Sequence, residues 1–193
     1  GAGDDLLDGG AGNDLLDGGV GADVILGDVG FDIVDYSGSA ATVIIDLSSA
    51  APQVGGDAAG DTLSSIEGVI GGGGDDFLYG DAFDNILDGG AGNDFIEGRG
   101  AADQIIGGLG QDTASFAGSA AGVTVDLTVV GAQISAGDAS GDTLSGIEHL
   151  LGSDQADVLR GDGAANSLTG GLGDDLLEGR GGADALAGGG GLD

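Results

Sequence analysis

The chain contains no cysteine, methionine, tryptophan or lysine, and it has only one histidine and one proline. Without cysteine it can form neither a disulfide framework nor a thiolate metal site. A single histidine excludes the two-histidine zinc motif H-E-x-x-H. One proline, with glycines that do not recur every third residue, excludes a collagen triple helix. Because the chain starts and stops inside a repeated unit and has no initiator methionine, we interpret the sequence as a fragment of a longer protein, and no signal peptide is visible in it.

Positive charge is also scarce, since three arginines face 34 acidic residues and the formal net charge is −31. Nucleic acids and anionic membrane surfaces bind cationic side chains, so neither is expected as a partner. No apolar run is long enough for a membrane span. Such an acidic, glycine-rich composition is typical of disorder. However, 40% of the residues are hydrophobic, and they recur at fixed positions, which a disordered tail has no reason to maintain.

The recurring unit is the nonapeptide G-G-x-G-x-D-x-U-x, in which U is a large apolar residue. It is clearest as GGAGNDLLD at residues 9–17, GGAGNDFIE at 89–97 and GGLGDDLLE at 170–178. Numbered from the first glycine, position 6 is aspartate at Asp5, Asp14, Asp23, Asp32, Asp76, Asp94, Asp103, Asp112, Asp157, Asp175, Asp184 and Asp193. Position 8 is apolar at Leu7, Leu16, Ile25, Val34, Leu78, Leu87, Ile96, Ile105, Leu159, Leu168, Leu177 and Leu186.

This spacing predicts a turn followed by a very short strand in every repeat. The glycines allow positive φ, so the turn can aim its carbonyl oxygens at one point. Positions 6 and 8 of the strand face one way and position 7 the other. Two repeats then form one coil of eighteen residues, and turns eighteen residues apart stack about 4.8 Å apart. Calcium takes six to eight oxygens at about 2.3–2.6 Å, which is more than one such turn offers, so two stacked turns must share an ion.

Two segments interrupt the period. Residues 36–61 contain TVIIDL at 42–47, which predicts a strand, and then a small, polar stretch that predicts a loop. The pair YSGSAATVIIDL (36–47) and GDTLSSIE (60–67) returns as FAGSAAGVTVDL (116–127) and GDTLSGIE (141–148). The phase resumes with TLSSIEGVI at 62–70, which places Glu67, and by analogy Glu148, at position 6. We therefore expect repeats over 1–35, a flap plus repeats over 36–115, and a second such unit over 116–193, all in one continuous solenoid.

The repeats resemble the RTX haemolysin-type calcium-binding family over nearly the whole chain, and the flaps resemble the β-roll of serralysin-type secreted proteins. The resemblance implies an all-β fold, a parallel β-roll (a β-helix or solenoid) with two inserted strand-loop flaps. It also implies ligation by carbonyls of positions 2 and 4 and the carboxylate of one turn, with carbonyls of positions 1 and 3 and the carboxylate of the turn eighteen residues on. Carried over, the ligands are Gly1, Gly3, Asp5, Gly10, Gly12, Asp14, Gly18, Val20, Asp23, Gly27, Val29, Asp32, Gly72, Gly74, Asp76, Gly89, Gly90, Ala91, Gly92, Asp94, Asp103, Gly107, Leu109, Asp112, Asp157, Gly170, Gly171, Leu172, Gly173, Asp175, Asp184, Gly188, Gly190 and Asp193. Glu67 and Glu148 would ligate calcium beside Asp32 and Asp112.

Some repeats depart from the pattern. Asn85 and Asn166 occupy position 6 in GDAFDNILD (80–88) and GDGAANSLT (161–169), where a ladder of hydrogen bonds is the alternative to calcium. GSDQADVLR (152–160) lacks glycines at positions 2 and 4. Arg99 and Arg180 occupy equivalent places in the two units, and they either neutralise carboxylates where no ion binds or are simply solvated. The apolar residues at position 7 form either a binding stripe or a surface covered by the flaps.

The function that these observations favour is a calcium-binding module, disordered without the ion and folded with it. We expect about six to ten ions per chain, from ligands shared between turns. The resemblance implies a secreted, extracellular or cell-surface location, export by type I secretion machinery, and parent-protein domains outside this fragment. The alternatives are a carbohydrate-binding accessory module and a structural spacer of a surface layer or adhesin. No nucleophile–base or metal–histidine set predicts catalysis, so we expect no enzyme in this segment.

Overall fold

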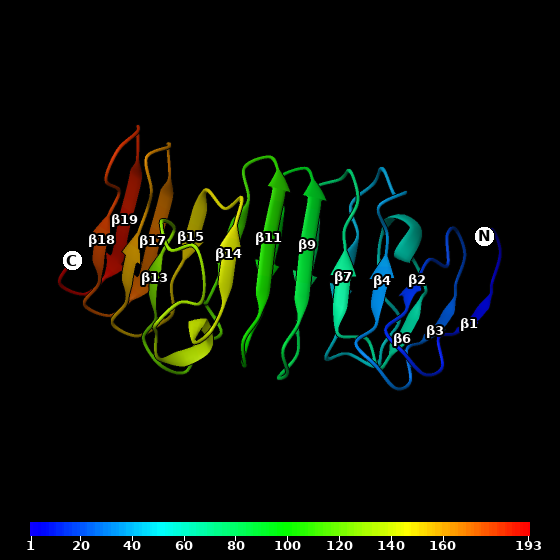
Figure 1. Cartoon of the computed structure of the whole chain (residues 1–193). Coiled ribbons are helices and arrows are strands. Elements are labelled where there is room, and N and C mark those ends of the chain that lie inside the picture. The colour runs from blue at the N-terminus through cyan, green and yellow to red at the C-terminus, as the bar shows by residue number, and fades with distance from the viewer.

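The computed structural model describes all residues, 1–193, as one elongated stack of short strands with the two termini at opposite ends (Figure 1). The strands are β1 (Leu6–Asp8), β2 (Leu15–Leu16), β3 (Val24–Leu26), β4 (Ile33–Asp35), β5 (Ile44–Asp46), β6 (Thr62–Ser64), β7 (Gly68–Ile70), β8 (Phe77–Tyr79), β9 (Ile86–Ala91), β10 (Phe95–Glu97), β11 (Gln104–Leu109), β12 (Thr113–Ser115), β13 (Thr124–Asp126), β14 (Thr143–Ser145), β15 (His149–Leu151), β16 (Val158–Arg160), β17 (Ser167–Leu172), β18 (Leu176–Glu178) and β19 (Ala185–Gly190). The only helical segments are two 3₁₀ turns, η1 (Gly56–Ala58) and η2 (Gly137–Ala139). Neither could cross a membrane.

All pairings between strands are parallel, and most partners lie eighteen residues apart, as the nonapeptide predicts. Leu7 pairs with Ile25, Leu78 with Ile96 and Leu87 with Ile105. Apart from the flap strands β5 and β13, successive strands alternate between two faces of the coil. One face carries the sheets β1-β3-β6 and β5-β8-β10-β12-β15-β17-β19, and the other carries β2-β4-β7-β9-β11-β14 and β13-β16-β18. The chain is therefore all-β and a parallel β-roll, as predicted.

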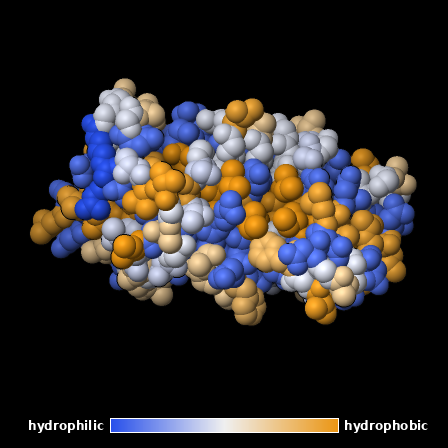
Figure 2. All heavy atoms as spheres, viewed as in Figure 1, coloured by the Kyte–Doolittle hydropathy of each residue, from blue (hydrophilic) through white to orange (hydrophobic).

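The core is a narrow ladder of position-8 side chains between the two faces. Ile25, Val34, Leu78, Leu87 and Ile96 are fully buried, and each stacks on its equivalent one coil away. Position 7 points the other way: Leu6 is 70% exposed, Leu15 61% and Leu176 56%. The flaps therefore do not cover these three side chains, and Figure 2 shows apolar atoms at the surface toward both ends of the stack.

Each flap replaces one half-coil, and the two flaps interrupt opposite faces. In flap 1 (residues 36–61) the sheet that contains β3 ends at β6, and the next sheet on that face starts at β5. In flap 2 (residues 116–142) the break lies on the other face, where the sheet that contains β11 ends at β14 and the next sheet starts at β13. The face changes because an odd number of half-coils, the seven of β6 to β12, separates the flap strands β5 and β13. The opposite sheet continues past each flap, from β4 to β7 and from β12 to β15.

The coil resumes at Gly56, six residues earlier than the sequence suggested. Thr62 pairs with Val24, and the preceding Asp61 accepts the N–H of Asp23 at 2.8 Å, so Asp61 holds position 6 of a coil. Asp142 does the same for Asp103 at 2.9 Å. The segments GDAAGDTLS (56–64) and GDASGDTLS (137–145) are thus disguised nonapeptides, and the half-coil that follows each is three residues shorter than a repeat.

Candidate metal site in the stacked turns

Turns of the regular repeats share a backbone conformation that only glycine adopts easily. In GGAGNDFIE, Gly90 at position 2 has φ 92° and Gly92 at position 4 has φ 132°. Gly10 and Gly12 take the corresponding values of 82° and 131°. An L-residue at these φ values is strained, whereas glycine is not. The two glycines therefore explain why the turn can curl tightly enough to bring oxygens of neighbouring coils together.

Position-6 carboxylates form ladders along both sides of the roll. In each ladder, one carboxylate oxygen accepts the backbone N–H of the position-6 residue one coil earlier. Asp94 Oδ1 accepts from Asp76 and Asp112 Oδ1 accepts from Asp94, both at 2.8 Å. Asp23, Asp32, Asp103, Asp175, Asp184 and Asp193 make the same contact. One oxygen of each carboxylate is thereby fixed, and the direction of the other is fixed with it.

The other oxygen of most of these carboxylates is buried and receives no hydrogen bond. This is the case for Oδ2 of Asp14, Asp23, Asp32, Asp94, Asp103, Asp112, Asp142 and Asp175. Burial raises the pKa of Asp94 to about 6 and that of Asp103 to about 8, and neighbouring carboxylates add to both shifts. A buried carboxylate without a partner is costly to ionise. A row of such oxygens is therefore the arrangement that a bound cation would stabilise.

A backbone carbonyl lies opposite five of these oxygens, and this pairing fits calcium. A Cβ atom placed on Gly89 would have both Oδ2 of Asp94 and the carbonyl oxygen of Gly107 within 2.7 Å. Two oxygens so near a common point can both ligate an ion with bonds of about 2.3–2.6 Å. The same pairing occurs for Asp14 with Gly27, for Asp32 with Ser65, for Asp112 with Gly146 and for Asp175 with Gly188.

Backbone oxygens must supply much of any coordination, because no group of three or more acidic, histidine or cysteine side chains converges anywhere in the structure. The predicted carbonyls of positions 2 and 3 line the stacked turns. Val20 N–H donates to Gly1 O at 3.0 Å, and Gly3 N–H donates to Val20 O at 2.7 Å. Gly10 and Val29, Gly72 and Ala91, and Gly173 and Gly190 stack in the same way. Each carbonyl oxygen retains a second lone pair for a cation.

Four turns differ, namely the two that follow each flap. Their position-6 side chain accepts the N–H of position 2 of its own turn, and none of their residues has a positive φ. Gly72 donates to Asp76 at 2.6 Å and Ser153 donates to Asp157 at 2.7 Å. Asp81 donates to Asn85, and Asp162 to Asn166, both at 2.8 Å. A donor therefore occupies the oxygen that is unpaired elsewhere, and the roles of Asp76 and Asp157 as ligands stay predictions.

Glu67 and Glu148 occupy the ladder as the sequence predicted. Asp32 N–H donates to Oε2 of Glu67 at 2.8 Å, and Asp112 N–H donates to Oε2 of Glu148 at 3.0 Å. The longer side chain of glutamate compensates for the shortened half-coil to which it belongs.

Sequence reasoning missed four residues of these coils, namely Asp61, Asp142, and the carbonyls of Ser65 and Gly146. The signal for the two aspartates was present, because Asp61 lies two residues before Leu63 and five after Gly56, as position 6 requires. The sequence could not predict the carbonyls of Ser65 and Gly146, because these residues occupy position 1 only when the turn that follows is shortened.

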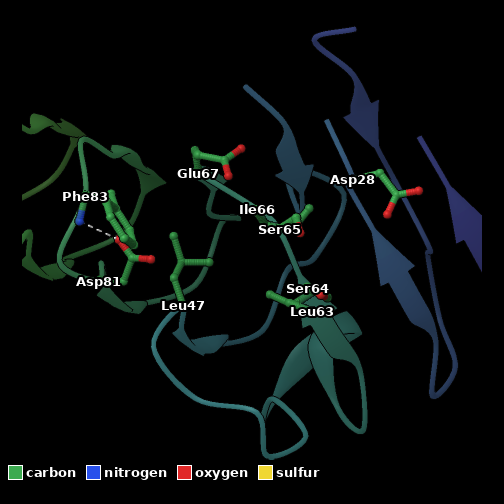
Figure 3. A pocket seen from close by; sticks show the side chains of 9 residues that line it. All are labelled: Asp28, Leu47, Leu63, Ser64, Ser65, Ile66, Glu67, Asp81 and Phe83. Carbon is green, nitrogen blue, oxygen red and sulfur yellow. Dashed lines mark hydrogen bonds between the residues drawn. The ribbon is translucent and has the colours of Figure 1, made fainter. Parts of the chain in front are cut away.

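A hollow of about 300 Å³ opens beside Glu67 (Figure 3). Its walls come from the repeat at 27–35, flap 1, the shortened turn and the repeat at 80–88, and they include Asp28, Leu47, Glu67, Asp81 and Phe83. Asp81 is held in place by the N–H of Phe83 at 2.9 Å. A smaller hollow of about 100 Å³ adjoins Glu148. Both flap-exit glutamates thus lie where solvent and ions can approach.

A parallel β-roll whose stacked turns present unpaired carboxylate oxygens to carbonyls defines a calcium-binding repeat protein. Residues 1–34, 69–87, 79–114, 142–177 and 160–193 match the family of RTX calcium-binding nonapeptide repeats (4 copies). The chain therefore belongs to this RTX family. None of the curated proteins matches the chain.

Proposed function

We propose that this chain is a module that folds when calcium binds and then stabilises a larger protein to which it is joined. The row of buried carboxylate oxygens without hydrogen-bond donors carries this proposal. Stacking brings like charges into a low-dielectric environment, which opposes folding until a cation neutralises them. A ligand that binds only the folded state stabilises it by mass action. Calcium binding and folding are therefore one process.

Five turns combine an unpaired carboxylate oxygen with a carbonyl from the next coil, and we place calcium there. They are the turns of Asp14, Asp32, Asp94, Asp112 and Asp175. Glu67 completes the turn of Asp32, and Glu148 that of Asp112. The turns of Asp76, Asn85, Asp157 and Asn166 already have an N–H donor at the equivalent oxygen, so calcium binds them less well.

The surrounding conditions decide when such a module folds. RTX repeats are typical of secreted proteins, and we propose that the chain leaves the cell unfolded, through type I secretion machinery, and folds outside. Extracellular calcium modules bind with dissociation constants of about 10⁻⁴–10⁻³ M. An affinity in this range keeps the chain unfolded where calcium is scarce and folded where it is abundant. We assign the chain a structural role in the parent protein and no catalytic step.

Circular dichroism and calorimetry on the full chain test the proposal. We expect little β-structure in excess chelator, and a cooperative gain of β-structure as calcium rises toward millimolar concentrations. Magnesium at the same concentrations is the control, because it demands a smaller octahedral site and dehydrates reluctantly. A chain that is fully β-structured in chelator would contradict calcium-driven folding. Dissociation constants in the nanomolar range would contradict the secretion switch.

A further inference from the structure

Arg99 lies within a nest of oxygen atoms where flap 1 meets the roll. Its Nη1 donates to Oδ1 of Asp46 at 2.8 Å, to Oγ of Ser48 at 2.7 Å and to the carbonyl oxygen of Gly80 at 2.5 Å. Its Nη2 donates to Oδ2 of Asp46 at 3.0 Å. Asp46 and Ser48 belong to flap 1, and Gly80 belongs to the roll. One positive charge therefore joins the two parts.

Arg180 repeats this arrangement in the second unit. Its Nη1 donates to Oδ1 of Asp126 at 2.7 Å, to Oγ1 of Thr128 at 3.1 Å and to the carbonyl oxygen of Gly161 at 2.8 Å. Its Nη2 also pairs with Oδ2 of Asp126. Because the two nests have the same composition and geometry, a chance surface contact does not account for them.

The carbonyl in each nest is one that calcium would otherwise use. Gly80 and Gly161 occupy position 1 of their repeats, and in regular turns the carbonyl of position 1 faces an unpaired carboxylate oxygen. Here it faces a guanidinium group instead. The repeats that begin at Gly80 and Gly161 are also the two whose position 6 is the neutral Asn85 or Asn166. The built-in cation thus occurs where the anionic ligand of the repeat is missing.

Both arginines have a left-handed backbone conformation, which is strained for a residue other than glycine. Arg99 has φ 71° and Arg180 has φ 65°, at a position where regular repeats have glycine. Arg160 is the only other cationic side chain of the protein, and its ion pair is with Glu178, 54% exposed, at 3.3 Å. Arg160 has no oxygen nest, and this makes it a matched control.

We infer that Arg99 and Arg180 stand in for calcium ions, so that each flap is fastened to the roll by a charge that the chain itself supplies. Nη1 has three oxygens at or below 3.1 Å in each nest, and calcium would hold such oxygens at about 2.3–2.6 Å. The nests therefore take no calcium in the natural chain. This inference rests on the proposed function insofar as the other turns bind calcium.

The test is to remove the built-in cation and count ions. In Arg99→Gly and Arg180→Gly, which restore the glycine of position 2, we expect each chain to bind about one calcium ion more than the natural chain, as a vacated oxygen nest allows. Arg160→Gly should bind the same number as the natural chain. An unchanged ion count in both nest variants, with β-structure retained, would overturn the inference.

Hydrogen exchange gives a second readout that does not depend on the ion count. The N–H of Leu47 donates to Tyr79 O at 2.9 Å, and the N–H of Leu127 donates to Arg160 O at 3.0 Å, so these amides report on the docking of flaps 1 and 2. Because a bidentate, charge-assisted contact is lost, Arg99→Gln should speed exchange of Leu47 by about tenfold and leave Leu127 unchanged, and Arg180→Gln the reverse. Unchanged exchange in both variants would overturn the role of the arginines. If the natural chain bound no calcium, the proposed function would fail, and the exchange result would still decide whether the flaps need these charges.

Discussion

The hydroxyl of Tyr36 donates a hydrogen bond of 2.9 Å to Oδ2 of Asp61, which joins the two ends of flap 1, and both residues are buried. Flap 2 has Phe116 at the equivalent position, also 2% exposed, and Oδ2 of Asp142 has no donor. The two units thus differ by one buried hydroxyl. Burial raises the pKa of Asp142 to about 7 and raises the pKa of Tyr36 well above its usual range.

We expect Phe116→Tyr to stabilise the calcium-saturated protein by about 1 kcal/mol, because it supplies a donor to a buried acceptor that lacks one. Tyr36→Phe should destabilise it by a similar amount, because it removes such a donor from Asp61. Urea unfolding of both variants in saturating calcium measures the difference. Equal unfolding midpoints for both variants and the natural chain would contradict the importance of this contact.

Asp94→Asn should lower the number of bound calcium ions by about one, because the unpaired Oδ2 of Asp94 and the carbonyl oxygen of Gly107 belong to one of the five proposed sites. Asp76→Asn is the matched control, since both oxygens of Asp76 already accept N–H groups and an amide oxygen can replace one of them. Calorimetric titration provides both stoichiometries. If Asp76→Asn loses as many ions as Asp94→Asn, the distinction between the two kinds of turn is wrong.

Glu67→Gln and Glu148→Gln should each lower bound calcium by about one ion and raise the calcium concentration at the folding midpoint, because a neutral amide is a weaker ligand. Glu178→Gln changes the same side chain at an exposed position on the strand and serves as the control. Calcium titrations followed by circular dichroism compare the three variants. Equal midpoints would mean that the flap-exit glutamates only pack the shortened turn.

The calcium-free chain should become more folded on acidification. The folded-state pKa of Asp94 is about 6 and that of Asp103 about 8, against an ordinary value of 3.8. A raised pKa means that the folded state binds the proton more tightly, so its stabilising contribution is complete below pH 3.8 and is lost as the pH rises through 6 to 8. Protons should thus partly replace calcium between pH 8 and about pH 5.5.

Circular dichroism of calcium-free protein across this pH range measures the effect, and Asp103→Asn should reduce it. A chain without calcium that shows the same β-structure at both ends of the range would contradict the expectation. With calcium present, the folded chain should bind the ion more weakly on acidification, because protons compete for the same oxygens, while less calcium should be needed to reach the folding midpoint.

The ladders show how much of the site the sequence determined. The nine-residue period placed Asp94 and Asp112 one coil apart, and they stack as predicted because turn and strand have fixed lengths. The position-8 core, the parallel pairing and the place of Glu67 followed from the same phase. The period of the sequence predicts the features that every repeat shares, and these are the apolar core and the regular turns.

The features that only the tertiary structure determined are found at the flaps, where the nine-residue period is interrupted. Asp76 lies in the same nonapeptide pattern as Asp94, with glycines at positions 1, 2 and 4, yet its turn stacks on flap 1, and the N–H of Val43 and that of Gly72 reach its oxygens. Whether a carboxylate retains an unpaired oxygen therefore depends on which coil precedes it, and local sequence does not encode this. Arg99 meets Asp46 across 53 residues for the same reason, because the contact exists only once the flap folds back onto the roll.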